Sequence, residues 1–181
     1  AFYGCSNLSS IILPSSLTLI ELQAFRGTNI SNIFIPKGVK SMQQSTFEEC
    51  SNLKEVIFEE DSSLIELKFT QFRSCSSLIK IELPDTIENM GDYLFKDCTS
   101  LKYCHYPINS KVTAINNSCF ENCSSLQELP ITDYITTLGS NTFRKCISLS
   151  GHLDLSRITS MGSGGFYGCQ GIESVDITSL E

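Results

Sequence analysis

The stretch that decides the fold is FRSCSSLIKIELPDTIENMGDYLF, residues 72–95. It begins and ends on a phenylalanine. Between the two it carries a cysteine, a leucine and an apolar alternation that closes on a proline. The same order of residue types recurs along the chain from its first residues to its last. Such self-similarity is the sequence signature of a repeat architecture, so the period governs every later inference.

Phenylalanine and cysteine keep a fixed phase in about eight units of 22–25 residues. The phenylalanines are Phe2, Phe25, Phe47, Phe72, Phe95, Phe120, Phe143 and Phe166. A cysteine follows three residues later in every unit except the second, where Thr28 takes its place. A unit of this size is too small to bury its own apolar side, so neighbouring units must stack and share one core. The pattern therefore predicts a solenoid.

The apolar alternation in each unit predicts one short strand, and stacking places these strands in a parallel sheet. Pro14, Pro36, Pro84 and Pro107 follow such alternations and end them, because proline cannot donate to the ladder. The segment around each phenylalanine and cysteine predicts roughly one helical or 3-10 turn. The expected fold is an α/β-type, right-handed stack of coils with the parallel sheet on a concave face.

The repeat resembles the BspA-like leucine-rich repeat. The resemblance rests on FRSCSSL at 72–78, IELP at 81–84 and the glycine that precedes the next phenylalanine. The chain differs from the more familiar leucine-rich repeats, because Cys-Ser-x-Leu stands where their asparagine ladder begins. The resemblance implies a leucine-rich repeat solenoid that is secreted or displayed on the cell surface of anaerobic bacteria or parasitic protists. It also implies a role in adhesion to host proteins or neighbouring cells.

Composition excludes several classes of protein. The 181 residues are 41% hydrophobic and 18% charged, which is too apolar for a disordered tail. No apolar run reaches the roughly 18 residues that span a bilayer, so no membrane insertion is expected. The net charge of −7 disfavours nucleic acid, whose binding depends on clustered lysine and arginine. We expect residues 1–181 to form a single solenoid domain.

The two ends of the sequence show no polar capping segment. Solenoids need such caps, because their terminal coils otherwise expose core residues. This absence predicts that the chain is a fragment of a longer repeat array. The alternative is end-to-end self-association, since an uncapped coil offers strand edges and apolar surface to a second molecule.

Most of the nine cysteines share one repeat phase, which predicts a buried column of free thiols. Equivalent Cα atoms would lie roughly 4.8 Å apart, within disulfide range, but their parallel Cβ vectors disfavour bond formation. No C-x-x-C spacing suggests a metal site. Cys104 and Cys119 lie outside the column phase and are also expected in the core.

Few residues offer catalytic chemistry. His105 is expected on the outer side of the sheet beside Glu82, while its neighbour Cys104 faces the core, so no nucleophile and base come together. The acidic turn Glu59–Asp61 lacks the alternating oxygen ligands of a calcium loop. The glycine-rich residues 162–165 lack the strand and the Lys-Ser/Thr of a phosphate loop. An enzyme is therefore the least favoured class, and no cofactor, metal or catalytic residue is predicted.

The outward positions of the strands are the expected contact surface. Their character changes along the axis, from apolar near the N-terminus to polar and acidic beyond it. The candidate partner-binding residues are Ile12, Phe34, Ile57, Lys80, Glu82, Tyr103 and His105. The next outward positions are Pro130, Asp154 and Asp176. An exposed apolar cluster rimmed by polar groups marks an interaction site, although strand propensity alone also favours such residues.

Both 25-residue units take their extra residues just after the strand, at 59–63 and 107–111. Insertions in solenoids often map to the binding face, so Tyr103, His105 and 107–111 are expected to form one polar-aromatic corner. The sequence thus predicts a non-catalytic module that binds a protein or glycan. The alternative is a structural or self-assembling spacer whose ligand site lies elsewhere.

Overall fold

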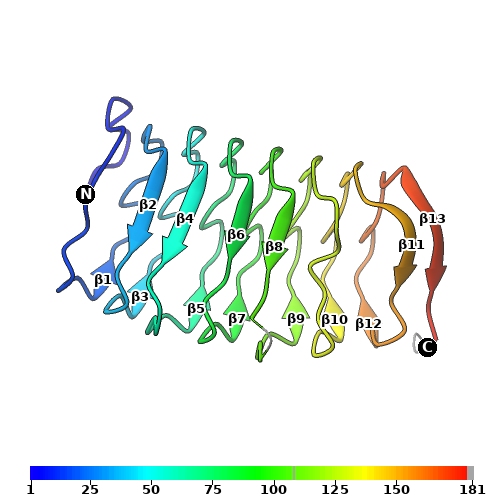
Figure 1. The fold of residues 1–181 in the computed structure, drawn as a ribbon. Helices are drawn as coiled ribbons and strands as arrows, with labels where there is room; N and C mark the ends of the chain where they lie inside the picture. Colours follow the sequence, from blue (N-terminus) through cyan, green and yellow to red (C-terminus); the bar gives the residue numbers. More distant parts are fainter. Residues whose placement is uncertain (108, 179–181) are drawn as a thin grey trace.

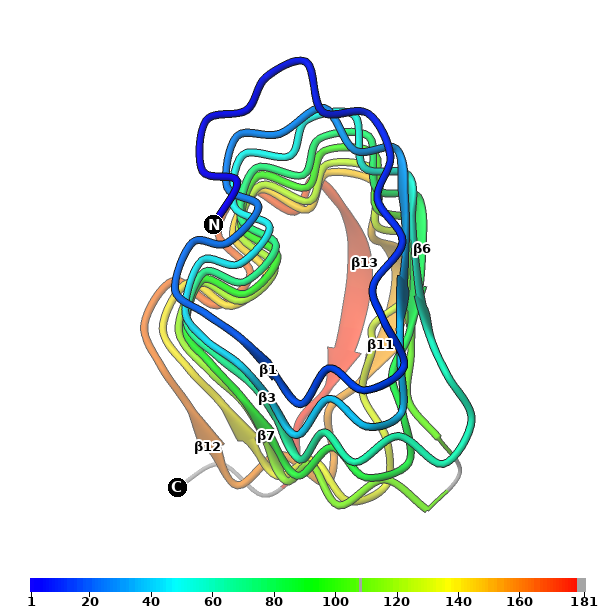
Figure 2. The same ribbon diagram turned by 90° about the vertical axis from the view of Figure 1, so that its left-hand side faces the viewer.

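The protein is a β-solenoid in a computed structural model that describes residues 1–107 and 109–178. Successive coils stack along one axis, with the two chain termini at opposite ends of the stack (Figure 1). Seen along that axis, the coils nest on one common outline, so equivalent residues of the units form columns (Figure 2). The predicted solenoid is confirmed.

Each coil contributes to two sets of parallel strands. The strands of the first set, which we call the long-strand face, are β2 (Asn32–Ile35), β4 (Glu55–Phe58), β6 (Lys80–Glu82), β8 (Tyr103–His105), β11 (Ser150–Asp154) and β13 (Gly171–Asp176). The second set consists of two-residue strands, β1 (Leu19–Ile20), β3 (Ser41–Met42), β5 (Glu66–Leu67), β7 (Asn89–Met90), β9 (Ala114–Ile115), β10 (Thr137–Leu138) and β12 (Ser160–Met161). The long-strand face carries the alternation that the sequence predicted.

A continuous stack of phenylalanine rings fills one side of the interior. Neighbouring rings lie with their centroids 5.3–5.8 Å apart, from Phe2 at one end to Phe166 at the other. The rings between Phe47 and Phe143 are completely buried. Stacked aromatic pairs stabilise a core beyond the area they bury, so this column joins every coil to the next.

The cysteine column lies beside the rings and also bonds across coils. Each thiol that belongs to the column, from Cys50 to Cys169, donates to the carbonyl of the phenylalanine in the preceding coil, at 3.0–3.1 Å. All nine cysteines are free, and most are buried, as predicted for the column. Thr28 takes the cysteine position in the second unit, but its hydroxyl donates to the Phe25 carbonyl of its own coil at 2.8 Å, and not to the preceding coil.

The predicted helical turn at the phenylalanines is wrong: the described residues form no helix there or elsewhere. Instead, two residues in most units adopt positive φ, for example Thr70 at 53° and Ser74 at 59° on either side of Phe72. The amides of these two residues, and the amide of the phenylalanine midway between them, point along the solenoid axis. The amides of Thr70, Phe72 and Ser74 donate to the next coil at 2.8–3.1 Å. A helix would have used those amides within its own coil.

The expectation of one continuous sheet is also wrong. The long strands form three separate hydrogen-bonded pairs, β2–β4, β6–β8 and β11–β13. The short strands form β1–β3, β5–β7 and β9–β10–β12. Hydrogen-bonded strands are related by steps of 21 to 23 residues, as from Ile33 to Val56. Among the described residues, steps of 25, as from Val56 to Ile81, leave the strands unpaired. The extra residues near 59–63 bulge beyond the common outline (Figure 2), which frees the next coil from strict register.

The phenylalanine stack gives a stability prediction. Replacing Phe95 by alanine should lower the free energy of unfolding by about 3–5 kcal/mol, because it removes a completely buried ring between two stacked neighbours. Urea denaturation measures the change. The control is Phe69→Ala, since that ring is 43% exposed and should cost well under half as much. Equal losses in the two variants would contradict the ring column as the main core element.

The buried thiols predict a loss of stability at alkaline pH. Burial raises the pKa of Cys75, Cys119 and Cys123 well above the ordinary 9.0. Unfolded thiols therefore ionise first, so the stabilisation is complete below pH 9.0 and is lost as the pH rises above it. Each buried thiol should lower the free energy of unfolding by about 1.4 kcal/mol per pH unit in that range.

Urea denaturation at a series of pH values above and below 9.0 measures this dependence. The variant Cys104→Val removes one buried thiol whose pKa is also raised by burial. Its unfolding free energy should fall less steeply with pH, by the contribution of one group. Identical slopes for the variant and the parent chain would show that the thiols do not control the alkaline transition.

Candidate functional site on the long-strand face

The N-terminal part of the long-strand face is apolar and exposed. Phe34 is 48% exposed and Ile57 44% exposed, and the two residues are direct partners in the β2–β4 ladder. Ile12 is 95% exposed and precedes Phe34 by one coil, in a stretch without an assigned strand. The structure thus confirms the outward orientation predicted for these three residues. We call them the apolar end of the face.

The centre of the face is polar. Lys80 and Glu82 form an ion pair at 3.2 Å within β6. In β8 the rings of Tyr103 and His105 lie 5.8 Å apart, and the Tyr103 hydroxyl donates to Gln127 of the next coil. Glu82 and His105 are ladder partners, as predicted. However, Glu82 pairs with Lys80, and no ion pair joins it to His105 among the described residues.

The predicted corner at 107–111 is seen only in part. Tyr103 and His105 do lie together, but residue 108 is outside the described residues. Lys111 forms an ion pair with Glu88 at 2.7 Å, which directs its ammonium group to the short-strand edge of the preceding coil. The sequence therefore located the aromatic pair correctly, whereas Lys111 pairs with Glu88.

Pro130 is the clearest departure from the sequence-based expectation. It was expected outward, in line with Glu82 and His105, but it is buried, and residues 127–131 form no strand. The Ile131 amide donates to the Leu129 carbonyl at 2.8 Å, a tight turn that has Pro130 at its centre. The fixed φ of proline suits that turn, and proline has no amide to donate to β8.

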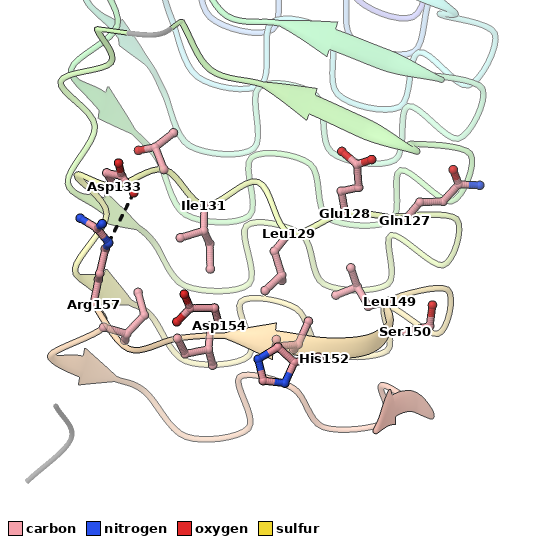
Figure 3. A pocket seen from close by; sticks show the side chains of 14 residues that line it. Gln127, Glu128, Leu129, Ile131, Asp133, Leu149, Ser150, His152, Asp154 and Arg157 are labelled. Atoms are coloured by element: carbon pink, nitrogen blue, oxygen red, sulfur yellow. Dashed lines mark ion pairs between the residues drawn. The ribbon is translucent and has the colours of Figure 1, made fainter. Parts of the chain in front are cut away.

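A cleft opens where this coil fails to pair. It has a volume of 450 Å³ and lies between residues 127–133 and strand β11. Figure 3 shows Leu129 and Ile131 projecting toward β11, and the two segments stand apart in Figure 1. The cleft is lined by Gln127, Glu128, Leu129, Ile131, Thr132, Asp133, Leu149, Ser150, His152, Leu153, Asp154, Leu155, Arg157 and Ile158.

The rim of the cleft carries excess negative charge. Arg157 compensates Asp133 at 3.4 Å, as marked in Figure 3. Hydrogen bonds from Ser156 hold the pKa of the Asp154 carboxyl below its ordinary value, so it is ionised at neutral pH. Within the described chain, neither Asp154 nor Glu128 is in an ion pair. The rim therefore suits a cationic ligand better than an anionic one.

His152, two residues before Asp154 in β11, contacts the last long strand. Its Nδ1 lies 2.9 Å from the Ser174 hydroxyl, and its Nε2 lies 3.4 Å from Asp176. These contacts hold the imidazole against β13 at the outer edge of the cleft. The sequence pattern placed Asp154 and Asp176 outward correctly, but it did not indicate the cleft. The missed signal was Pro130, because a proline in the middle of an alternation argues against an internal strand.

In residues 1–107 and 109–178, no group of three or more His, Cys, Asp or Glu side chains is placed to hold a metal ion. The same residues include no helix with the length and hydropathy required to cross a bilayer.

Family comparisons agree with the architecture. The model of the BspA type leucine-rich repeat region matches residues 1–102 and 65–180, in 6 copies. The chain belongs to this family of leucine-rich repeat proteins. No curated protein matches it.

Solved structures of bacterial leucine-rich repeat proteins share the fold. The T. pallidum leucine-rich repeat protein is 30% identical with a TM-score of 0.72, over 82% of this chain and 68% of that one. The pneumococcal vaccine antigen PcpA is 23% identical with a TM-score of 0.71, over 91% of this chain and 44% of that one. A leucine-rich cell surface protein of Faecalibacterium prausnitzii is 23% identical with a TM-score of 0.63, over 96% and 55%. The chain thus spans about half the length of the last two.

The tight turn at Pro130 predicts the effect of its removal. Pro130→Thr restores an amide and frees the Leu129 carbonyl and Ile131 amide to pair with Asp154, so the Asp154 amide should exchange at least about tenfold more slowly. Hydrogen exchange followed by NMR measures that rate. The matched control is Pro84→Thr, after the end of β6, which should leave the Asp154 rate unchanged. An unchanged rate in Pro130→Thr would show that proline is not the cause of the break.

Proposed function

We propose that this chain is a non-catalytic binding module of a secreted or cell-surface protein. It mediates adhesion to proteins of a host or of neighbouring cells, with no nucleic-acid partner. Its contact surface is the long-strand face, and the residues that carry binding are the predicted ones, Ile12, Phe34, Ile57, Lys80, Glu82, Tyr103 and His105.

The observation that carries this proposal is the apolar end of the face. Phe34 and Ile57 remain about half exposed although they sit side by side on a hydrogen-bonded ladder. A protein ligand that covers them recovers the free energy of removing apolar surface from water. The polar groups of Tyr103 and His105 lie further along the same face and supply directional contacts. Apolar anchors with a polar surround are typical of protein interfaces and favour a protein over a glycan.

We propose a non-catalytic module partly because of the burial and protonation of Cys104, the cysteine next to a histidine. Cys104 adjoins His105 in β8, but its side chain faces the core, and burial raises its pKa. It therefore stays protonated at neutral pH and cannot act as a nucleophile there.

The surface location is supported by two structural relatives. One is a leucine-rich cell surface protein and the other a vaccine antigen. Both are 23% identical to this chain, so their descriptions support the location in the proposal but do not identify a ligand.

The alternative is a self-assembling spacer, and one observation favours it. The first coil carries an apolar groove of 350 Å³ that includes Phe2, Ile11 and Leu17. In that case the molecules would associate end to end through the groove. Sedimentation equilibrium over a range of concentrations separates the two functions, because a spacer self-associates through Phe2 and Leu17, whereas a binding module does not require it.

The test is a binding assay against purified extracellular-matrix proteins immobilised one by one. Phe34→Ser with Ile57→Ser should weaken binding of a positive ligand at least about tenfold, since buried apolar anchors each contribute about 1–2 kcal/mol or more. Tyr103→Ala with His105→Ala should weaken it less. The matched control is Leu22→Ser with Ile65→Ser, two exposed apolar residues outside the long strands. Equal binding by all three variants would overturn the assignment of the face.

A further inference from the structure

We propose that the cleft between residues 127–133 and β11 binds an extended, basic peptide segment of a partner protein. The peptide adds as a strand to the free edge of β11. This site is separate from the apolar end of the face and does not depend on Phe34 or Ile57. It is therefore a second recognition site, defined by the break in the solenoid.

The edge of β11 that borders the cleft has unpaired backbone groups. The Leu155 amide donates to the Asp176 carbonyl at 2.9 Å, so the backbone of Leu155 and Leu153 faces β13. In a parallel ladder successive residues point to opposite neighbours, so the amide and carbonyl of Asp154 face the cleft. No backbone hydrogen bond joins β11 to residues 127–131 among the described residues.

The opposite wall cannot satisfy that edge. Two coils earlier, the Leu83 amide donates to the His105 carbonyl at 2.9 Å, and Ile131 is the equivalent of Leu83. The Ile131 amide is instead bonded to the Leu129 carbonyl around Pro130. The two groups that would complete the ladder to Asp154 are thus bonded to each other. An added strand can supply the missing donor and acceptor.

The cleft has the size and the polar groups that such a ligand needs. Its 450 Å³ falls within the roughly 300–1,000 Å³ typical of ligand pockets. The Thr132 hydroxyl, which lines the cleft, is buried and has no hydrogen-bond partner in the described structure. A buried hydroxyl without a partner is costly, so a ligand that reaches it is favoured.

The side chains around the cleft define the chemistry of the peptide. Successive residues of an extended chain point to opposite sides, so one set meets the apolar floor at Leu129 and Ile131. The other set meets the rim, where Glu128 and Asp154 are carboxylates outside any ion pair of the described residues. The complementary sequence alternates branched apolar residues with lysine or arginine. An acidic peptide is repelled by the same rim.

The test uses a fluorescein-labelled peptide of alternating lysine and valine with the complete chain, followed by fluorescence anisotropy. We expect saturable binding below about 1 mM, and at least about tenfold weaker binding of the matched glutamate–valine peptide. A lysine–valine peptide with alternate N-methylated amides keeps the charges but cannot pair as a strand. It should also bind at least about tenfold more weakly. Equal binding of the methylated peptide would overturn strand addition.

Three variants locate the site. Pro130→Thr should abolish peptide binding by closing the ladder, and the double change Glu128→Gln with Asp154→Asn should weaken it about tenfold. The control for charge is Glu60→Gln with Asp61→Asn, which removes two exposed carboxylates away from the cleft and should leave affinity unchanged. Peptide binding that survives Pro130→Thr, or that responds equally to both double variants, would overturn the site.

A measurement on the parent chain does not depend on whether the variants fold. In the parent chain the peptide should slow hydrogen exchange of the Asp154 amide, while the ladder amides of β2–β4 are unaffected. Absence of binding up to about 1 mM, or binding without that protection, would refute the proposal. Self-association abolished by Pro130→Thr would also refute it, since the occupant would then be a second copy of this chain.

Discussion

The hydrogen bonds at the phenylalanine turns are the constraint on which the rest of the solenoid depends. Each phenylalanine amide from Phe25 to Phe143 donates to the next coil, including the steps of 25 residues. The thiols add a second bond in the opposite direction, from each cysteine to the phenylalanine carbonyl before it. Because these bonds recur at every step, this side of the molecule fixes the stacking of the coils independently of the sheets.

That division explains how the long-strand face can vary without loss of the fold. The strand pairs β2–β4, β6–β8 and β11–β13 are separated by breaks that the turn ladder spans. An insertion near 59–63 or a proline at 130 removes sheet bonds locally, but the coils remain stacked. Sequence variation between the repeats is therefore tolerated on the long-strand face. There it produces exposed apolar residues at one end and an acidic cleft at the other. A scaffold of this kind suits recognition better than catalysis.

The sequence was sufficient for the parts that depend on regular repetition. The phase of phenylalanine, cysteine and leucine determined which residues are inside, and alternation determined that Phe34, Ile57 and His105 point outward. The sequence-based prediction failed where the same residue pattern is compatible with two local backbone conformations. A short Phe-x-x-Cys segment can bond within its own coil as a helix or along the axis as the observed turn, and only the neighbouring carbonyls select between them. The signal at Pro130 was present, but the repeat alignment outweighed it.

The amino-acid sequence alone determined that this protein is a stack of about eight short coils with a shared column of rings and thiols. A repeated apolar pattern can be buried in only a few architectures, and stacking of the repeats is the one that fits units of this length. Only the tertiary structure decided where neighbouring coils pair and where they separate. Pairing depends on backbone groups from residues more than twenty positions apart, such as Ile131 and Asp154, and no side-chain pattern records whether those groups meet. The cleft beside β11 exists because two neighbouring coils do not pair there.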